Sequence, residues 1–203
     1  MRRTLTSGIN TNIELKTGNW LLVVGGRAIV PTMLKMTARL AENGTSAALA
    51  AETADDGLKP SRPVVHVVDG GHRYDPSQVE RLSHGRREIL ERIKVSEAFD
   101  CHEMLSILEG LPAGPEPFVV IDLLRPFHDP FVWAGERKRL LRLCLVHLNR
   151  LVGASARGGL VSVHPPCVLS QIESELLEMV TTNAKDTFQV PMMAPASSMA
   201  RRI

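Results

Sequence analysis

The stretch from Gly25 to Thr32 is the first part of the chain whose residue types could bind an anion, and it follows the apolar run WLLVV at 20–24. Phosphate-binding loops of the pattern G-x-x-x-x-G-K-[ST] combine glycines, whose backbone N–H groups face the phosphates, with a lysine and a magnesium-binding hydroxyl. This chain keeps the first glycine as Gly25 and the hydroxyl as Thr32, but has Val30 and Pro31 in place of the second glycine and the lysine. The pattern therefore predicts a strand, a glycine turn and a helix, with the two groups most important for phosphate missing.

A second group with chemical potential is the carboxylate of Asp122, which ends the apolar run FVVID at 118–122. An aspartate at the end of a buried strand can hold the magnesium ion that accompanies a bound nucleoside triphosphate. Aspartate and threonine in such positions also form turns and cap helices without any ligand. Both interpretations stand for Asp122 and for Thr32, and the structural one is favoured.

The cysteines and histidines do not supply another active site. Cys101, Cys144 and Cys167 have no CxxC spacing, which argues against a disulfide framework and a thiolate zinc site. Cys101-His102-Glu103 falls on an expected helix, where adjacent side chains point in different directions. His164 and Cys167 flank two prolines at a strand end, where a plain loop is favoured over a catalytic or metal site. We therefore expect no metal site.

Composition limits the classes of protein that the chain can belong to. The 203 residues carry 24 Lys and Arg against 22 Asp and Glu, for a net charge of +2. This balance gives no bulk electrostatic reason to bind nucleic acid or an anionic membrane, although a local basic patch is compatible with it. No apolar stretch is long enough to span a membrane, and Thr4, Ser7 and Asn10 stand where a signal peptide needs apolar residues. We expect a soluble protein with no membrane partner, cytoplasmic or, in a eukaryote, nuclear.

Hydrophobic periodicity predicts alternating strands and helices. Strands are expected at 20–24, 64–68, 94–99, 118–124, 159–163 and 187–190. Helices are expected from Pro31 to a stop at Asn43-Gly44 and at 76–93 with a break near Gly85, 101–111, 136–151 and 172–180. This alternation predicts a three-layer α/β/α domain with a mostly parallel, twisted sheet. We expect residues 1–190 to form a single domain, with 45–62 as a surface insertion and 191–203 as a flexible tail.

The middle of the chain carries a family resemblance. The segment DGGHRYDP at 69–76 resembles the pattern D-T-E-G-T-F-R-P, with the aspartate, the aromatic residue and the proline at matching offsets. The pair Ala98-Phe99 and the run FVVID at 118–122 follow in the order of the same family. From Ser7 to Val190 the chain resembles the RecA-like recombinase core, in particular the archaeal and eukaryotic strand-exchange recombinases and their paralogues. The resemblance implies a RecA-like fold of the P-loop NTPase type.

The departures from that family bear on catalysis. The family's glutamate base corresponds to Gly71, its phosphate-binding lysine to Pro31, and its polar sensor pair to His164-Pro165-Pro166. Loss of lysine, base and sensor removes several kcal/mol of transition-state stabilisation, at ~1.4 kcal/mol per tenfold in rate. We therefore expect no enzyme activity and no cofactor. The alternative is a divergent DNA-dependent ATPase that uses ATP and magnesium and recruits Arg27, Lys35 or a neighbouring subunit's cation.

The resemblance also implies where nucleotide and DNA would bind. The degenerate nucleotide site would consist of Gly25, Gly26, Arg27, Thr32 and Asp122. The first DNA-binding loop of the family would fall at about 125–139, and the cations expected to contact DNA phosphates there are Arg125, Arg137, Lys138 and Arg139. A solvated helix start is the plain alternative for these cations.

The loop at 126–134 concentrates two phenylalanines and a tryptophan in a chain with few aromatic residues. Exposed aromatic side chains are typical anchors of protein interfaces, so Phe127, Phe131 and Trp133 are expected to contact a partner or, alternatively, to pack on the chain's own sheet. The sequence thus predicts a non-catalytic accessory or scaffold protein in DNA recombination or repair. It would form homo- or hetero-oligomers with RecA-like proteins and make weak DNA contacts. A self-associating structural protein with no nucleic-acid role is a third interpretation.

Overall fold

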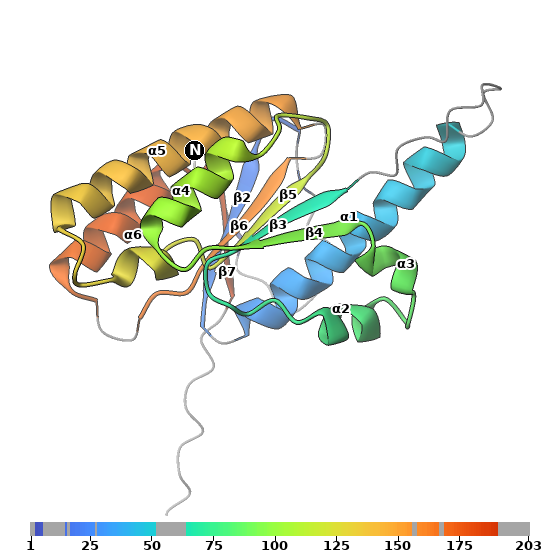
Figure 1. Ribbon diagram of the computed structural model, residues 1–203, viewed down its shortest axis with the longest axis horizontal. Helices are drawn as coiled ribbons and strands as arrows, with labels where there is room; N and C mark the ends of the chain where they lie inside the picture. The colour runs from blue at the N-terminus through green and yellow to red at the C-terminus, as the bar shows by residue number, and fades with distance from the viewer. Residues whose placement is uncertain are drawn as a thin grey trace, which may run out of the picture.

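Seven parallel strands form one sheet in the computed structural model, in the order β1-β7-β2-β6-β5-β3-β4 (Figure 1). The structure describes residues 3–5, 15, 17–26, 28–51, 64–155, 158–166 and 169–190, without the side chains of 3–5 and 43–51. The strands are β1 (Arg3–Leu5), β2 (Trp20–Gly25), β3 (Val65–Asp69), β4 (Ile93–Glu97), β5 (Phe118–Ile121), β6 (Gly159–Val163) and β7 (Asp186–Val190). Every strand pairing is parallel, so all carboxyl ends lie at one edge of the sheet.

Helices cover both faces of the sheet, as Figure 1 shows. One face carries α1 (Ile29–Ala51), α2 (Pro76–Leu82) and α3 (Arg87–Leu90). The opposite face carries α4 (Cys101–Gly110), the short 3-10 helix η1 (Arg125–His128), α5 (Ala134–Ala154) and α6 (Gln171–Asn183). Among the described residues, no helix is long and apolar enough to span a membrane.

Two hydrophobic cores explain why the central strands are apolar at every position. Successive residues of a strand point to opposite faces, so a sheet covered on both sides needs apolar residues throughout. Trp20 and Leu22 of β2 pack into the core beneath α4, α5 and α6. Leu21 and Val23 of the same strand pack into the core beneath α1, α2 and α3. A deletion or insertion within β2 would exchange these two sets.

Three helix starts are fixed by side chains that bond the first backbone N–H groups, which have no partner within the helix. Asp75 accepts hydrogen bonds from the first turn of α2, and Asp100 does so for α4. Ser170 and Glu173 form a reciprocal capping box at the start of α6. These caps set the exit direction of the chain from the carboxyl edge of the sheet.

The structure confirms the mixed α/β class, the parallel sheet and the helices on both faces that the sequence predicts. The predicted stop at Asn43-Gly44 is wrong, because α1 continues to Ala51 through the alanine-rich segment SAALAA, whose helix propensity outweighs the cost of one glycine. The strand β1 and the helix η1 were not predicted. Arg27, Cys167, residues 52–63 and the tail at 191–203 lie outside the described residues.

Gly159 at the start of β6 is required by a close contact across the sheet. A Cβ atom there would lie 2.2 Å from the ring of Phe118, which is buried on the neighbouring strand β5. We predict that Gly159→Ala lowers the free energy of unfolding by about 1–3 kcal/mol, measured by urea denaturation. The matched control is Gly153→Ala in α5, where a Cβ meets no atom within 4 Å. That change should be neutral or stabilise by up to ~1 kcal/mol; equal effects of the two variants would contradict the packing argument.

Candidate functional site

The residues singled out for nucleotide chemistry meet at the carboxyl edge of the sheet. Adjacent strands β2, β6, β5 and β3 end there, in the middle of the strand order (Figure 1). They are followed by Gly26, His164, Asp122 and Gly70, respectively. Crevices outside the carboxyl ends of parallel strands are where open α/β sheets bind ligands. The topology therefore places the ends of these four strands at one edge of the sheet. Whether the groups there can bind a ligand depends on the hydrogen bonds that each already makes.

The turn between β2 and α1 is short and closed by the protein's own groups. The Ile29 backbone N–H donates to the Gly26 carbonyl at 3.0 Å, so the helix begins almost directly after the strand. The Thr32 hydroxyl donates to the Ala28 carbonyl at 3.1 Å, inside the first turn of α1. A Cβ at Gly25 would lie 2.8 Å from both the Cβ and the carbonyl oxygen of Val190 on β7. Gly25 is thus required by the close contact with β7, and the Thr32 hydroxyl is bonded within the start of α1.

Asp122 is a buried carboxylate held by groups of the protein. Its Oδ1 accepts a hydrogen bond from the His164 backbone N–H at 3.2 Å, and its Oδ2 lies 3.6 Å from Nε of Arg73. Its own backbone N–H donates to the Ser162 hydroxyl at 2.9 Å. The residue has a φ of +57°, a left-handed conformation that aspartate tolerates better than most residues. Asp122 therefore links the ends of β5 and β6 to the loop after β3.

Burial raises the pKa of the Asp122 carboxyl above its ordinary value, because the charged form loses hydration. The His164 backbone hydrogen bond, Arg73 and the imidazoles of His164 and His128 oppose this shift, but they do not cancel it. The carboxylate is also engaged by the His164 N–H and by Arg73, which would compete with a metal ion for its oxygens. This environment favours the structural interpretation of Asp122.

The backbone at Gly71 lies against Asp122. A Cβ at position 71 would lie 2.9 Å from the Asp122 Cβ and 3.0 Å from its Oδ2. Real Cβ atoms do not approach other heavy atoms this closely, so the space that a side chain at 71 would enter is occupied. Position 71 is where the recombinase resemblance would have its glutamate base. A glutamate does not fit there while Asp122 keeps its conformation.

Asp69, at the end of β3, organises the loop that contains Gly71. Its fully buried carboxylate accepts hydrogen bonds from the backbone N–H groups of Gly71 at 2.9 Å, Arg73 at 2.6 Å and Tyr74 at 2.6 Å. Three backbone donors satisfy the charge and fix the loop. Three of the roughly four lone-pair sites of this carboxylate are therefore used within the loop.

The cations predicted to contact DNA have different environments, and most are engaged within the protein. Arg137 is buried and donates to the Phe127 carbonyl at 3.3 Å, so the expectation that it contacts DNA phosphates is wrong. Lys138 forms an ion pair with Glu175 of α6. Arg139 makes two hydrogen bonds of 2.7 Å with Glu136. Arg125 is exposed and forms no ion pair with the described residues.

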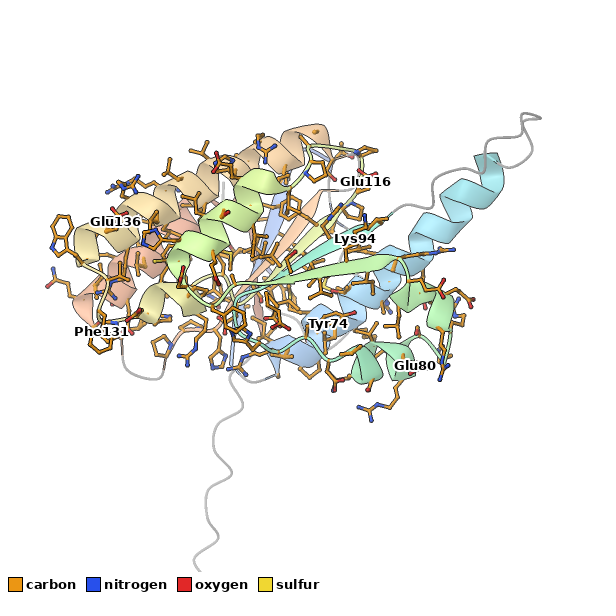
Figure 2. All side chains as sticks on the ribbon, in the orientation of Figure 1. Tyr74, Glu80, Lys94, Glu116, Phe131 and Glu136 are labelled. Atoms are coloured by element: carbon orange, nitrogen blue, oxygen red, sulfur yellow. The ribbon has the colours of Figure 1, made fainter. Side chains whose placement is uncertain are left out.

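The aromatic residues of the loop before α5 divide into one core residue and two surface residues. Phe127 is fully buried, which corrects its predicted role at an interface. Phe131 is 96% exposed and Trp133 is 78% exposed. Figure 2 shows Phe131 projecting from the end of the molecule that carries the start of α5. Val132, between them, packs against the core and therefore holds the loop in place.

Further bonds fix this loop. The Phe131 backbone N–H donates to the Asp129 side chain at 2.9 Å, and the Arg137 backbone N–H donates to the Trp133 carbonyl at 3.0 Å. Nδ1 of His128 lies 3.1 Å from Oε1 of Glu173, which ties η1 to α6. The exposed rings of Phe131 and Trp133 therefore project from a backbone segment that is hydrogen-bonded to its neighbours before and after them.

Sequence analysis missed the polar partners of Asp122 and the His128–Glu173 pair. Ser162 carried a signal, because it is the one hydroxyl in the otherwise apolar strand GLVSV and a buried hydroxyl needs a partner. Arg73 and His128 carried none, because their partners are distant in sequence. No group of His, Cys, Asp and Glu among the described residues has the arrangement of a metal site. Cys101 and Cys144 are buried, and burial raises the pKa of both thiols, to about 12 for Cys144.

Comparison with known proteins does not assign this arrangement to a family. No protein-family model matches the chain, and a search of curated proteins gave no match.

The environment of Asp122 generates a stability prediction with a defined pH dependence. Because its folded-state pKa is raised above the ordinary 3.8, its stabilising contribution is present below pH ~4 and is lost as pH rises through the folded pKa. Asp122→Asn keeps an acceptor for the His164 N–H and removes the charge. We predict that the stability of Asp122→Asn relative to the wild type increases between pH 3.5 and pH 8, measured by urea unfolding.

The control is Asp122→Ala, which leaves the His164 N–H without its acceptor and places alanine in a left-handed conformation. It should be about 2–4 kcal/mol less stable than Asp122→Asn at every pH, because neither variant has an ionisable group at position 122. A relative stability of Asp122→Asn that falls with rising pH would mean that the ionised carboxylate is the stabilising form, and would contradict this account.

Proposed function

We propose that this protein is a non-catalytic, RecA-like accessory or scaffold protein of DNA recombination or repair that acts through protein contacts and does not hydrolyse ATP. The RecA-like architecture is part of this proposal. It is supported by the sequence resemblance and by the convergence of the glycine turn, Asp122 and His164 at one edge of a parallel sheet.

One observation carries the proposal: the polar groups that remain from a nucleotide site are already bonded to the protein. The Thr32 hydroxyl bonds the Ala28 carbonyl, and Asp122 is buried against the His164 N–H and Arg73. These bonds use the Thr32 proton and one oxygen of Asp122, and Arg73 would compete with a magnesium ion for the other oxygen of Asp122. In this proposal, the residues at the positions of a nucleotide site serve as internal support.

Protein contact is the function that the surface supports best. Phe131 and Trp133 are large, rigid and exposed, and their loop is fixed by the packing of Val132 and by backbone hydrogen bonds. A loop whose backbone is held in place before binding loses little backbone entropy on association, and aromatic residues are typical anchors of interfaces. The partner would be a second copy or another RecA-like protein. Of the four cations predicted to contact DNA, only Arg125 is neither buried nor paired with a described residue.

Titration with ATP and magnesium tests the loss of nucleotide chemistry. We expect no saturable binding tighter than ~100 µM, equivalent to ~5.5 kcal/mol, in calorimetry, and no phosphate release above background. Magnesium-dependent ATP turnover that disappears in Thr32→Val would instead establish the divergent ATPase. Thr32→Val keeps the shape of the side chain and removes only the hydroxyl, so its effect would not come from misfolding.

The aromatic loop gives a prediction on association. We expect Trp133→Ala to weaken oligomer formation by tenfold or more, equivalent to ~1.4 kcal/mol, in sedimentation velocity, with an unchanged thermal midpoint. Phe127→Ala is the comparison, because it removes a buried ring and should cost about 3–5 kcal/mol of stability. A large fall in the midpoint of Trp133→Ala would show that the ring belongs to the core. A wild-type protein that stays monomeric would exclude self-association and leave only a different RecA-like partner.

A further inference from the structure

A hollow of about 380 Å³ lies between α5 and α6, which pack side by side on the same face of the sheet (Figure 1). Lys138 and Arg142 line it from α5, and five residues between Glu175 and Asn183 line it from α6. The aromatic loop, residues 126–134, leads into the start of α5, but neither of its exposed rings lines the hollow. The described lining thus has no aromatic side chain of its own.

The charged groups of the hollow balance one another. Lys138 of α5 forms an ion pair with Glu175 of α6. Arg142 and Glu178 are exposed and form no ion pair with the described residues. Two positive and two negative charges leave no net charge to attract an ion. Such a hollow suits a neutral side chain whose polar atom can be hydrogen-bonded.

The remaining lining groups have the chemistry that an indole ring requires. Met179 is half-buried and packs against the core, and thioethers make favourable contacts with aromatic rings. A guanidinium such as that of Arg142 can stack on the face of an indole. The Asn183 side-chain amide donates to the Met179 carbonyl at 2.9 Å, which leaves its own oxygen to accept from an indole N–H.

Trp133 is the exposed side chain of this chain that matches the hollow. It is 78% exposed, and its N–H has no partner among the described residues. A Cβ at Gly135 would lie 2.4 Å from two atoms of its ring, so the ring lies against the first turn of α5. An indole held in this way presents its other face to solvent. When such a ring is buried in an interface, its N–H needs an acceptor.

We propose that the hollow between α5 and α6 binds the Trp133 indole of a second copy of this chain. The inference rests on the proposed function, because it names the surface that receives the aromatic loop. The ring and the hollow are different patches of one chain, so each copy can offer both. The contact then repeats either as a reciprocal pair in a dimer or head to tail in a longer assembly.

The surroundings of the two patches also fit together. Asp129, at the base of the aromatic loop, forms no ion pair with the described residues, and neither does Arg142 at the hollow, so the contact can join opposite charges. Leu143 and Val146 follow Arg142 on α5 and are 36% and 61% exposed. These apolar side chains can exclude water around the bound ring.

Sedimentation velocity of the full chain, from about 1 to 100 µM, tests the contact. We expect Thr182→Arg to weaken association by about tenfold or more, as Trp133→Ala does, because it places a long side chain in the hollow. Position 182 is exposed, and an arginine there can pair with Glu178 four residues earlier, so α6 should keep its stability. The matched control is Ser106→Arg, at an exposed position of α4 away from the hollow, which should leave association unchanged.

A mixture of the two variants is the decisive arm. Trp133→Ala keeps the hollow and Thr182→Arg keeps the indole, so labelled Thr182→Arg should bind unlabelled Trp133→Ala as a 1:1 complex, although neither variant associates with itself. Arg142→Glu, also at an exposed position, repeats the test if Thr182→Arg lowers the thermal midpoint.

Three results would overturn the inference: a wild-type protein that stays monomeric at ~100 µM, association that the hollow variants leave unchanged, or a mixture that forms no complex. If Trp133→Ala alone weakens association, the indole binds elsewhere and the proposed function stands. ATP turnover in the titration described above would instead refute the proposed function without changing this contact.

Discussion

The hydrogen bond from the His164 backbone to the buried Asp122 carboxylate is the contact on which the arrangement of the carboxyl edge of the sheet depends. It joins β6 to β5, and the ion pair with Arg73 extends the connection to the loop after β3. The close approach of Gly70 and Gly71 to Asp122 follows from the same arrangement. If this carboxylate faced solvent, it would be the group at this edge most available to a ligand. It is instead buried, and it joins β5, β6 and the loop after β3.

Basic side chains on and around α5 are likewise bonded within the protein. Arg137 is buried on the Phe127 carbonyl, Lys138 pairs with Glu175, and Arg150 donates to three carbonyls at the end of α4. Basic residues at these positions thus hold helices and loops together, and the surface between them is apolar at Leu143 and Val146.

The elements of the core could be predicted from the sequence because a strand covered on both faces must be apolar at every position. β2, β3, β5 and β6 were therefore found within one to three residues of their ends. Local order in the candidate site could be predicted only where a residue bonds its sequence neighbours, as Asp75 and Asp100 do at helix starts. The burial of Phe127 and Arg137 could not be predicted. Neither the loop before α5 nor the first turn of α5 has a sequence pattern that separates side chains facing the core from side chains facing solvent.

The contact between Gly71 and Asp122 also constrains how this chain can change. A residue with a side chain at 71 becomes acceptable only after Asp122 leaves its left-handed conformation, and that conformation is supported by Ser162 and His164 on another strand. Several separate substitutions would have to accumulate before a carboxylate base could occupy position 71. A single substitution at position 71 is thus excluded by sterics, and positions 71 and 122 are expected to change together.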